Sequence, residues 1–143
     1  MKTIEHYIDA HVCIIKLNRP KVFNSFNKDM ALALQSILGD CEKNTDVRAI
    51  LLTGEGKAFS AGQDLQEITD PNGPALSDIV SQHYNPIIER IRNIEKPIVC
   101  AVNGVAAGAG ANIALACDIT IAGESVAFIQ AFSKIGLIPD SGG

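Results

Sequence analysis

Short apolar runs in the chain have the length and the residue types of β-strands. Residues 4–9 and 12–17 are rich in β-branched side chains and are separated by Ala10 and His11, so they predict a β-hairpin. Residues 48–53 and 97–102 are continuous apolar runs, which are typical of strands buried on both faces. Further short strands are expected at residues 119–122 and 126–128.

Other stretches have helical spacing. Asn27 offers a side-chain cap to a helix that follows it, and a second amphipathic helix is expected over residues 77–94. Residues 63–68 predict a short helical turn, and residues 113–117 an alanine-rich helix. Leu34, Ile37, Leu38 and Cys41 form the apolar face of the first helix, and Ile79, Ile87, Ile91 and Ile94 that of the second. Strands that alternate with helices define an α/β fold, in one domain over residues 1–143.

Composition narrows the function classes. The net charge is −4, without a basic run, so binding of nucleic acid through a positive face is not expected. Neither a signal peptide nor an apolar run of transmembrane length is visible, so we expect a cytoplasmic protein that does not bind membranes. The four cysteines are widely spaced, which favours buried free thiols, and no ligand spacing suggests a metal site.

A run of small residues, Asn103–Asn112, connects an apolar strand to a helix. Such a turn leaves main-chain N–H groups unpaired at a helix N-terminus, where they bind an anion or stabilise charge on a carbonyl oxygen. A second small-residue turn at residues 60–65 (Ser-Ala-Gly-Gln-Asp-Leu) also follows a buried strand. Because parallel strands end at the same edge of a sheet, the two turns together predict an oxyanion hole. Tight connections without a ligand are the alternative interpretation.

Four segments resemble the enoyl-CoA hydratase/isomerase (crotonase) superfamily. They are Leu-Asn-Arg-Pro at 17–20 with Asn-Ser-Phe at 24–26, Lys-Ala-Phe-Ser-Ala-Gly-Gln-Asp-Leu at 57–65, Lys-Pro-Ile-Val-Cys-Ala-Val-Asn-Gly at 96–104 with the small-residue turn after it, and Ala-Cys-Asp-Ile at 116–119. The resemblance implies the crotonase (ClpP-like) fold, a spiral of ββα repeats, assembled as a trimer or a dimer of trimers. Family members are longer, so we expect that this chain is the N-terminal half or slightly more, with the C-terminal part of the fold missing.

The resemblance also implies a substrate and its binding residues. The substrate is an acyl-CoA thioester, and no cofactor is needed because CoA is part of the substrate. The main-chain N–H groups of Gln63 and Ala109 hold the thioester oxygen. Lys21 and Lys57 are candidates for contacts to the CoA phosphates. The other residues implied to contact the substrate or CoA are Ala61, Gly62, Gln63, Asp64, Leu65, Gly108 and Phe132. Both lysines can equally be ordinary solvated side chains.

The chain departs from the hydratases where they carry two catalytic glutamates. Asn112 and Phe132 stand at those positions, and neither exchanges protons at neutral pH. Asp140 is the acid that remains, and the segment around it resembles the 1,2-epoxyphenylacetyl-CoA isomerases of phenylacetate breakdown. We therefore expect an acyl-CoA isomerase with Asp140 as base and Asn112 as an orienting group. Alternatively, Asp140 is a turn residue after a proline, without a catalytic role. A hydratase of the same fold and a truncated, non-catalytic chain are the alternative functions.

Overall fold

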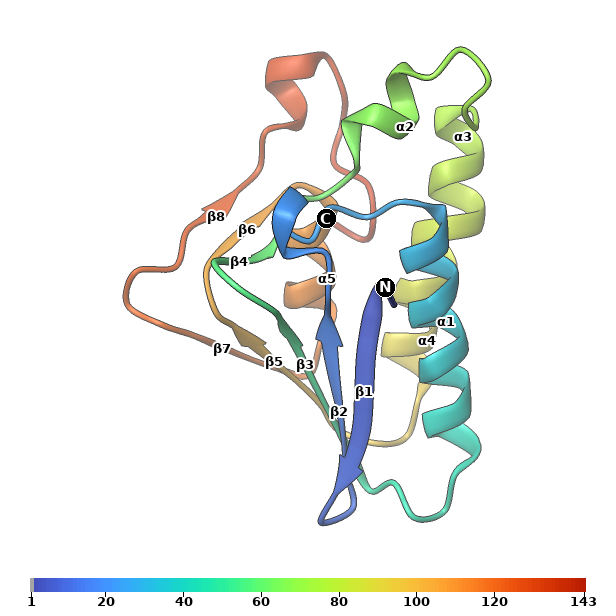
Figure 1. The fold of residues 1–143 in the computed structure, drawn as a ribbon, viewed down its shortest axis with the longest axis vertical. Helices are drawn as coiled ribbons and strands as arrows, with labels where there is room; N and C mark the ends of the chain where they lie inside the picture. The colour runs from blue at the N-terminus through green and yellow to red at the C-terminus, as the bar shows by residue number, and fades with distance from the viewer. Residues whose placement is uncertain (1) are drawn as a thin grey trace.

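The strands of this protein form two sheets, which the computed structural model describes over residues 2–143 (Figure 1). The larger sheet has the order β1-β2-β3-β5-β7 and consists of β1 (Ile4–Asp9), β2 (Val12–Leu17), β3 (Ala49–Gly54), β5 (Ile98–Val102) and β7 (Ile119–Ala122). The smaller sheet has the order β4-β6-β8 and consists of β4 (Ala58–Ser60), β6 (Val105–Ala107) and β8 (Phe128–Ile129). Only the β1–β2 pair is antiparallel, which confirms the predicted hairpin; the other strand pairs described are parallel.

The chain repeats one ββα pattern along its length. After β3, β5 and β7 it leaves the large sheet, adds a strand to the small sheet and then coils. The coiled segments are α2 (Leu65–Thr69), α5 (Ala109–Ala116) and a 3₁₀ turn (Phe132–Ile135). This succession confirms the spiral of ββα repeats that the resemblance implied.

Two long helical segments cover one face of the large sheet (Figure 1). Helix α1 (Lys28–Lys43) begins where expected, because the Asn27 side chain accepts a hydrogen bond from the Met30 N–H. The second segment consists of α3 (Leu76–Asp78), a π-helical stretch (Ile79–Tyr84) and α4 (Asn85–Asn93). All eight apolar positions predicted to face inward from these two segments are buried. Among the described residues, no helix is both long and apolar enough to cross a membrane.

Several predicted elements differ from the structure. The strand expected at residues 48–53 is Ala49–Gly54, and its side chains alternate between buried and partly buried, because helices cover only one face there. The helix expected over residues 77–94 is interrupted by the π-helical stretch. The alanine-rich helix begins at Ala109, inside the small-residue turn, and the strand expected at 126–128 is reduced to Phe128–Ile129. Strands β4 and β6 lie in stretches that the pattern indicated as turns.

Candidate active site

Two turns that follow neighbouring strands of the small sheet are packed against each other. The turn after β4 contains Gly62, whose φ is +87° and whose missing Cβ would lie 2.7 Å from the Ala107 carbonyl oxygen. The first turn of α5, after β6, contains Gly110, whose missing Cβ would lie 2.7 Å from the Ser60 Cβ. Only glycine fits at either position, so the small residues of both motifs bring the two turns together.

Each turn contributes one main-chain donor without a partner. Within residues 2–143, the N–H groups of Gln63 and Ala109 donate no hydrogen bond. Ala109 is the first residue of α5, preceded by Gly108 at φ +52°, so its N–H lies at the positive end of the helix. Both residues line the same cavity. Two unpaired donors beside one cavity are the elements of an oxyanion hole.

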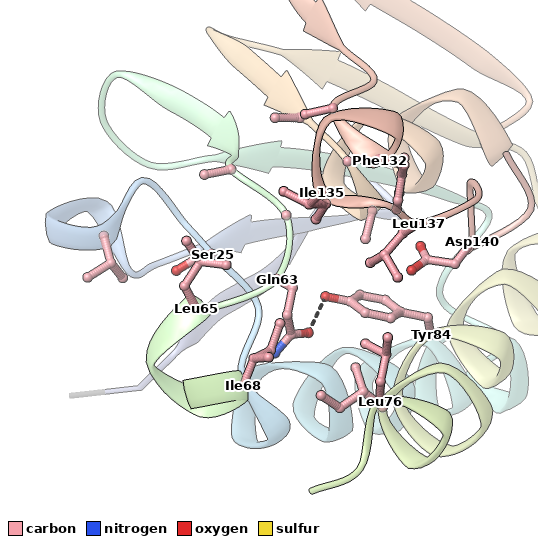
Figure 2. Close-up of a pocket in the computed structure, with 18 residues that line it drawn as sticks. Ser25, Gln63, Leu65, Ile68, Leu76, Tyr84, Phe132, Ile135, Leu137 and Asp140 are labelled. Atoms are coloured by element: carbon pink, nitrogen blue, oxygen red, sulfur yellow. Dashed lines mark hydrogen bonds between the residues drawn. The ribbon is translucent and has the colours of Figure 1, made fainter. Parts of the chain in front are cut away.

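The cavity has a volume of about 460 Å³ and is mostly apolar (Figure 2). Its lining includes eight of the residues predicted for the site: Ala61, Gly62, Gln63, Leu65, Gly108, Ala109, Phe132 and Asp140. Additional lining residues come from several elements: Val22, Ser25, Ile68, Leu76, Ile79, Tyr84, Ala107, Ala131, Ile135 and Leu137. An apolar cavity with a few convergent polar groups is typical of a small-molecule site.

Asp140 is the carboxylate among the residues that line this cavity. Its Oδ1 accepts a hydrogen bond of 2.7 Å from the Ser141 hydroxyl, and its main-chain oxygen accepts one of 2.6 Å from the Asn112 side-chain amide. Within the described part of the chain, Oδ2 makes no hydrogen bond, which leaves one carboxylate oxygen available to a substrate.

Asn112 is buried beneath the Asp140 segment and does not line the cavity. Both ends of its side-chain amide are engaged, since Oδ1 accepts a hydrogen bond of 2.5 Å from Gln130 and Nδ2 donates to the Asp140 carbonyl. The structure therefore places Asn112 where it holds the Asp140 segment, and not where it was expected to orient a substrate directly.

Phe132 forms part of the cavity wall next to the turn that leads into α5. Its ring edge lies 3.8 Å from the position that a Cβ on Gly108 would occupy, and its side chain is buried. An apolar ring therefore stands where hydratases of the family carry a glutamate, according to the sequence resemblance. The ring therefore adds apolar surface to the cavity beside Gly108.

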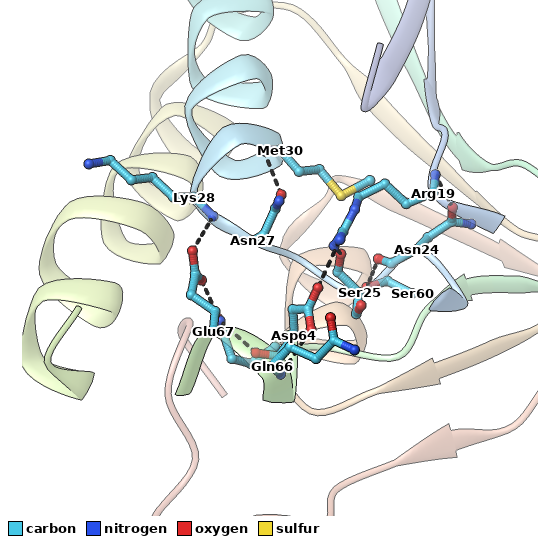
Figure 3. Close-up of polar contacts among 11 residues, drawn as sticks. Arg19, Asn24, Ser25, Asn27, Lys28, Met30, Ser60, Asp64, Gln66 and Glu67 are labelled. Atoms are coloured by element: carbon cyan, nitrogen blue, oxygen red, sulfur yellow. Dashed lines mark hydrogen bonds and ion pairs between the residues drawn. The ribbon is translucent and has the colours of Figure 1, made fainter. Parts of the chain in front are cut away.

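Three residues predicted to bind CoA lie away from the cavity. Asp64 pairs with Arg19 at 2.8 Å and caps α2 by accepting a hydrogen bond from the Gln66 N–H, so its carboxylate is used structurally (Figure 3). Lys21 lines a separate hollow of about 270 Å³ next to Arg19. Lys57 is exposed and lines neither hollow.

Buried polar contacts fix the turn that carries Gln63 (residues 60–65, the oxyanion turn). The Ser60 hydroxyl donates to the Asn24 carbonyl at 2.8 Å and accepts a hydrogen bond from the Gly62 N–H at 3.2 Å. The Asn24 side-chain amide donates to the Ala58 carbonyl at 2.8 Å. These side chains and the Arg19–Asp64 pair lie close together in Figure 3. Together they hold the turn through side chains that do not line the cavity.

Tyr84 is a polar lining residue that sequence reasoning missed, as is Ser25. Its side chain is fully buried, and its hydroxyl donates a hydrogen bond of 2.7 Å to Gln63 Oε1 (Figure 2). Burial raises the pKa of the Tyr84 hydroxyl, and the carboxylates of Asp140 and Glu67 raise it further, so the hydroxyl stays protonated. A tyrosine inside an amphipathic helical pattern gives no signal of this position.

Within residues 2–143 no three His, Cys, Asp or Glu side chains lie close enough together to hold a metal ion. The polar groups at the described site include two main-chain donors and one carboxylate, beside an apolar cavity. Such a site binds a carbonyl compound, stabilises negative charge on its oxygen and moves a proton nearby.

Comparison of the sequence with known proteins shows which family the chain belongs to. The enoyl-CoA hydratase/isomerase family model matches residues 7–143. The 1,2-epoxyphenylacetyl-CoA isomerase of Escherichia coli K12 is 49% identical, over 100% of this chain and 56% of the relative. The short-chain-enoyl-CoA hydratase of Clostridium acetobutylicum is 35% identical, over 94% of this chain and 52% of the relative.

Solved structures agree with this assignment. The crystal structure of enoyl-CoA hydratase from Bacillus anthracis superposes with a TM-score of 0.86 at 33% identity, covering 98% of this chain and 55% of that one. The chain belongs to the enoyl-CoA hydratase/isomerase family and has the crotonase fold. It spans about half the length of the relatives that it matches.

Proposed function

We propose that the protein is an isomerase that acts on acyl-CoA thioesters. The observation that carries the proposal is the set of polar groups at the cavity: the free N–H groups of Gln63 and Ala109 and the carboxylate of Asp140. The two positions at which hydratases carry glutamates hold Asn112 and Phe132. A single carboxylate can take a proton from one carbon and return it to another, whereas the usual hydration chemistry uses two.

The proposed reaction begins with the thioester oxygen between the two main-chain donors. They stabilise the negative charge that forms when a proton leaves the carbon next to the carbonyl. Asp140 accepts that proton on its free oxygen, and the electron pair of the broken C–H bond enters the enolate. Reprotonation at a different carbon by the same carboxyl gives the isomer and restores the carboxylate. The proposed reaction needs no cofactor, because CoA is part of the substrate.

For the particular substrates we propose 3-enoyl-CoA thioesters, on which this proton transfer shifts the double bond, and a ring-epoxide thioester of the 1,2-epoxyphenylacetyl-CoA type. Rearrangement of the ring epoxide to an oxepin breaks the carbon–carbon bond shared by the two rings and needs no net proton transfer, so there the two main-chain donors bind and polarise the thioester. Support comes from the 49% identity to the E. coli isomerase and from the apolar cavity, whose lining includes Phe132 and Tyr84. Hydration of an enoyl-CoA is the second candidate, because hydratases are also among the similar proteins. A homotrimer or a dimer of trimers is the assembly that we propose for the full protein.

The test is proton NMR in D₂O with a 3-enoyl-CoA, using the full protein and its Asp140→Asn variant. The proposal expects a shifted double bond and no hydroxyacyl product, with the rate lost in the variant by at least about a hundredfold. Asp9→Asn is the matched control, since Asp9 is an exposed aspartate at the end of β1. A hydroxyacyl product would favour the hydratase, and equal rates in the wild type and Asp140→Asn would exclude Asp140 as the base.

A further inference from the structure

Tyr84 lies between the oxyanion turn and Asp140, although its side chain comes from a different part of the chain (Figure 2). Its ring packs edge-on against Phe26, with ring centroids 6.0 Å apart. Its hydroxyl donates to Gln63 Oε1 at 2.7 Å, and the raised pKa described above keeps the proton on the phenol. Tyr84 is therefore a buried hydrogen-bond donor that points at the side chain of Gln63.

The Gln63 side chain is held at its other end as well. Its Nε2 donates to Glu67 Oε2 at 2.8 Å, and Glu67 Oε1 accepts a hydrogen bond of 2.9 Å from the Lys28 N–H at the start of α1. With both ends of the amide engaged, the side chain of Gln63 has one orientation. Because that side chain and the unpaired N–H belong to the same residue, the hydrogen bonds also restrain the main-chain donor.

A local departure from regular helix places Tyr84 at this position. Pro86 has no N–H with which to bond the Gln82 carbonyl, and the Asn85 N–H instead bonds the Val80 carbonyl five residues back. The Gln35 side chain of α1 donates to the Gln82 carbonyl at 2.8 Å and to the His83 carbonyl at 3.0 Å.

The wider turn changes which side chains face inward. Ile79, five residues before Tyr84, is buried, while Val80, four residues before it, is only partly buried. Insertions of this kind are frequent at functional sites. The π-helical stretch thus keeps Ile87 in the core while it directs Tyr84 toward Gln63.

We propose that Tyr84 is a positioning residue for catalysis, which acts through the Gln63 side chain to fix the Gln63 N–H in the oxyanion hole. The inference rests on the proposed function, because it assumes that this N–H polarises a thioester carbonyl. It assigns no proton transfer to the phenol. Its consequence is that the Tyr84 hydroxyl contributes to the chemical step and little to the binding of the CoA part of the substrate.

The experiment measures carbonyl polarisation directly with cinnamoyl-CoA, a conjugated thioester whose ultraviolet band moves to longer wavelength when its carbonyl is polarised. The full protein, Tyr84→Phe and Gln63→Met are titrated with this probe, and kcat and KM are measured with the isomerase substrate. Tyr84→Phe should reduce the band shift and lower kcat about tenfold, with KM unchanged within about twofold. Tyr7→Phe is the matched control, because Tyr7 is the second tyrosine and is exposed on β1.

A double variant tests whether Tyr84 acts through Gln63. In the Gln63→Met background, Tyr84→Phe should have little further effect on kcat or on the band shift, since the connecting hydrogen bond is already lost. Gln63→Met breaks the same hydrogen bond from the other side, so it tests the inference even if Tyr84→Phe fails to fold. Additive losses, or a full band shift in both single variants, would overturn the inference. If the wild-type protein itself gives no band shift, the proposed function is wrong rather than the role of Tyr84 within it.

Discussion

The Arg19–Asp64 ion pair gives a quantitative test of how the oxyanion turn is held. Arg19 Nη2 lies 2.8 Å from Asp64 Oδ2, and Nη1 donates to the Ser25 carbonyl at 2.5 Å. The two side chains are only 20% and 10% exposed. Removing one partner of such a pair leaves the other charge poorly solvated, so Arg19→Met should lower the free energy of unfolding by about 3 kcal/mol.

The reverse single variant and the double variant complete the cycle. Asp64→Asn should cost about 2 kcal/mol, less than Arg19→Met, because arginine keeps its hydrogen bond to Ser25 and asparagine still caps α2. The double variant has no unpaired charge, so it should cost about 2 kcal/mol rather than the sum of the two. The expected coupling free energy is therefore about 3 kcal/mol.

Urea unfolding of the four proteins measures these values by linear extrapolation. The control is the Arg90–Glu42 pair, which is 3.5 Å apart and 41% and 48% exposed, and for which a coupling below about 1 kcal/mol is expected. If the two cycles gave the same small coupling, the Arg19–Asp64 contact would be an ordinary surface pair and the reasoning about the buried turn would fail.

Three further substitutions test other parts of the structure. Asn27→Ala should lower the free energy of unfolding by about 1 kcal/mol, because the Asn27 side chain caps α1 at the Met30 N–H. Asn27→Asp keeps an oxygen that caps the helix, so it should leave the free energy unchanged; thermal unfolding of both variants measures the difference. Gly62→Ala should cost more than about 2 kcal/mol and abolish turnover, since its φ is +87° and the added carbon would lie 2.7 Å from the Ala107 oxygen; a normally active alanine variant would refute this. Burial raises the pKa of the Cys41 thiol from 9.0 to about 12, so its contribution to stability is present below pH 9 and lost as the pH rises toward 12. The free energy of unfolding should therefore fall less steeply over that range in Cys41→Ala than in the wild type, and equal slopes in denaturation curves would refute this.

The elements predicted correctly from the sequence are those that local signals determine. The β-hairpin has two β-branched runs on either side of a two-residue turn, and α1 has its cap at Asn27 and a complete apolar face. Strands β4 and β6 are three residues each, too short to show a period, so they were predicted as turns. Their pairing depends on tertiary contacts such as the close approach of Gly110 to Ser60, which no local pattern contains.

The candidate site was predictable where main-chain geometry defines it. The turns with Gln63 and Ala109 are marked by their small residues, and Asp140 stands out as an acid beside them. Lys21 and Lys57 were not predictable in this way, because a lysine has the same appearance in sequence whether or not it binds a phosphate. Tyr84 was missed because its position depends on the π-helical stretch, which the apolar spacing of residues 77–94 does not reveal.

The small sheet explains why residues so distant in sequence share one cavity. Strands β4, β6 and β8 are parallel neighbours, so their carboxyl ends lie at one edge of the sheet. The first two strands lead into the turns that carry Gln63 and Ala109, and β8 leads into the 3₁₀ turn that begins at Phe132. The two donors are main-chain groups held by glycine contacts, whereas Phe132 lines the cavity with its side chain and follows the third strand, β8. Substitution after β8 can therefore change one wall of the cavity while the two main-chain donors keep their positions.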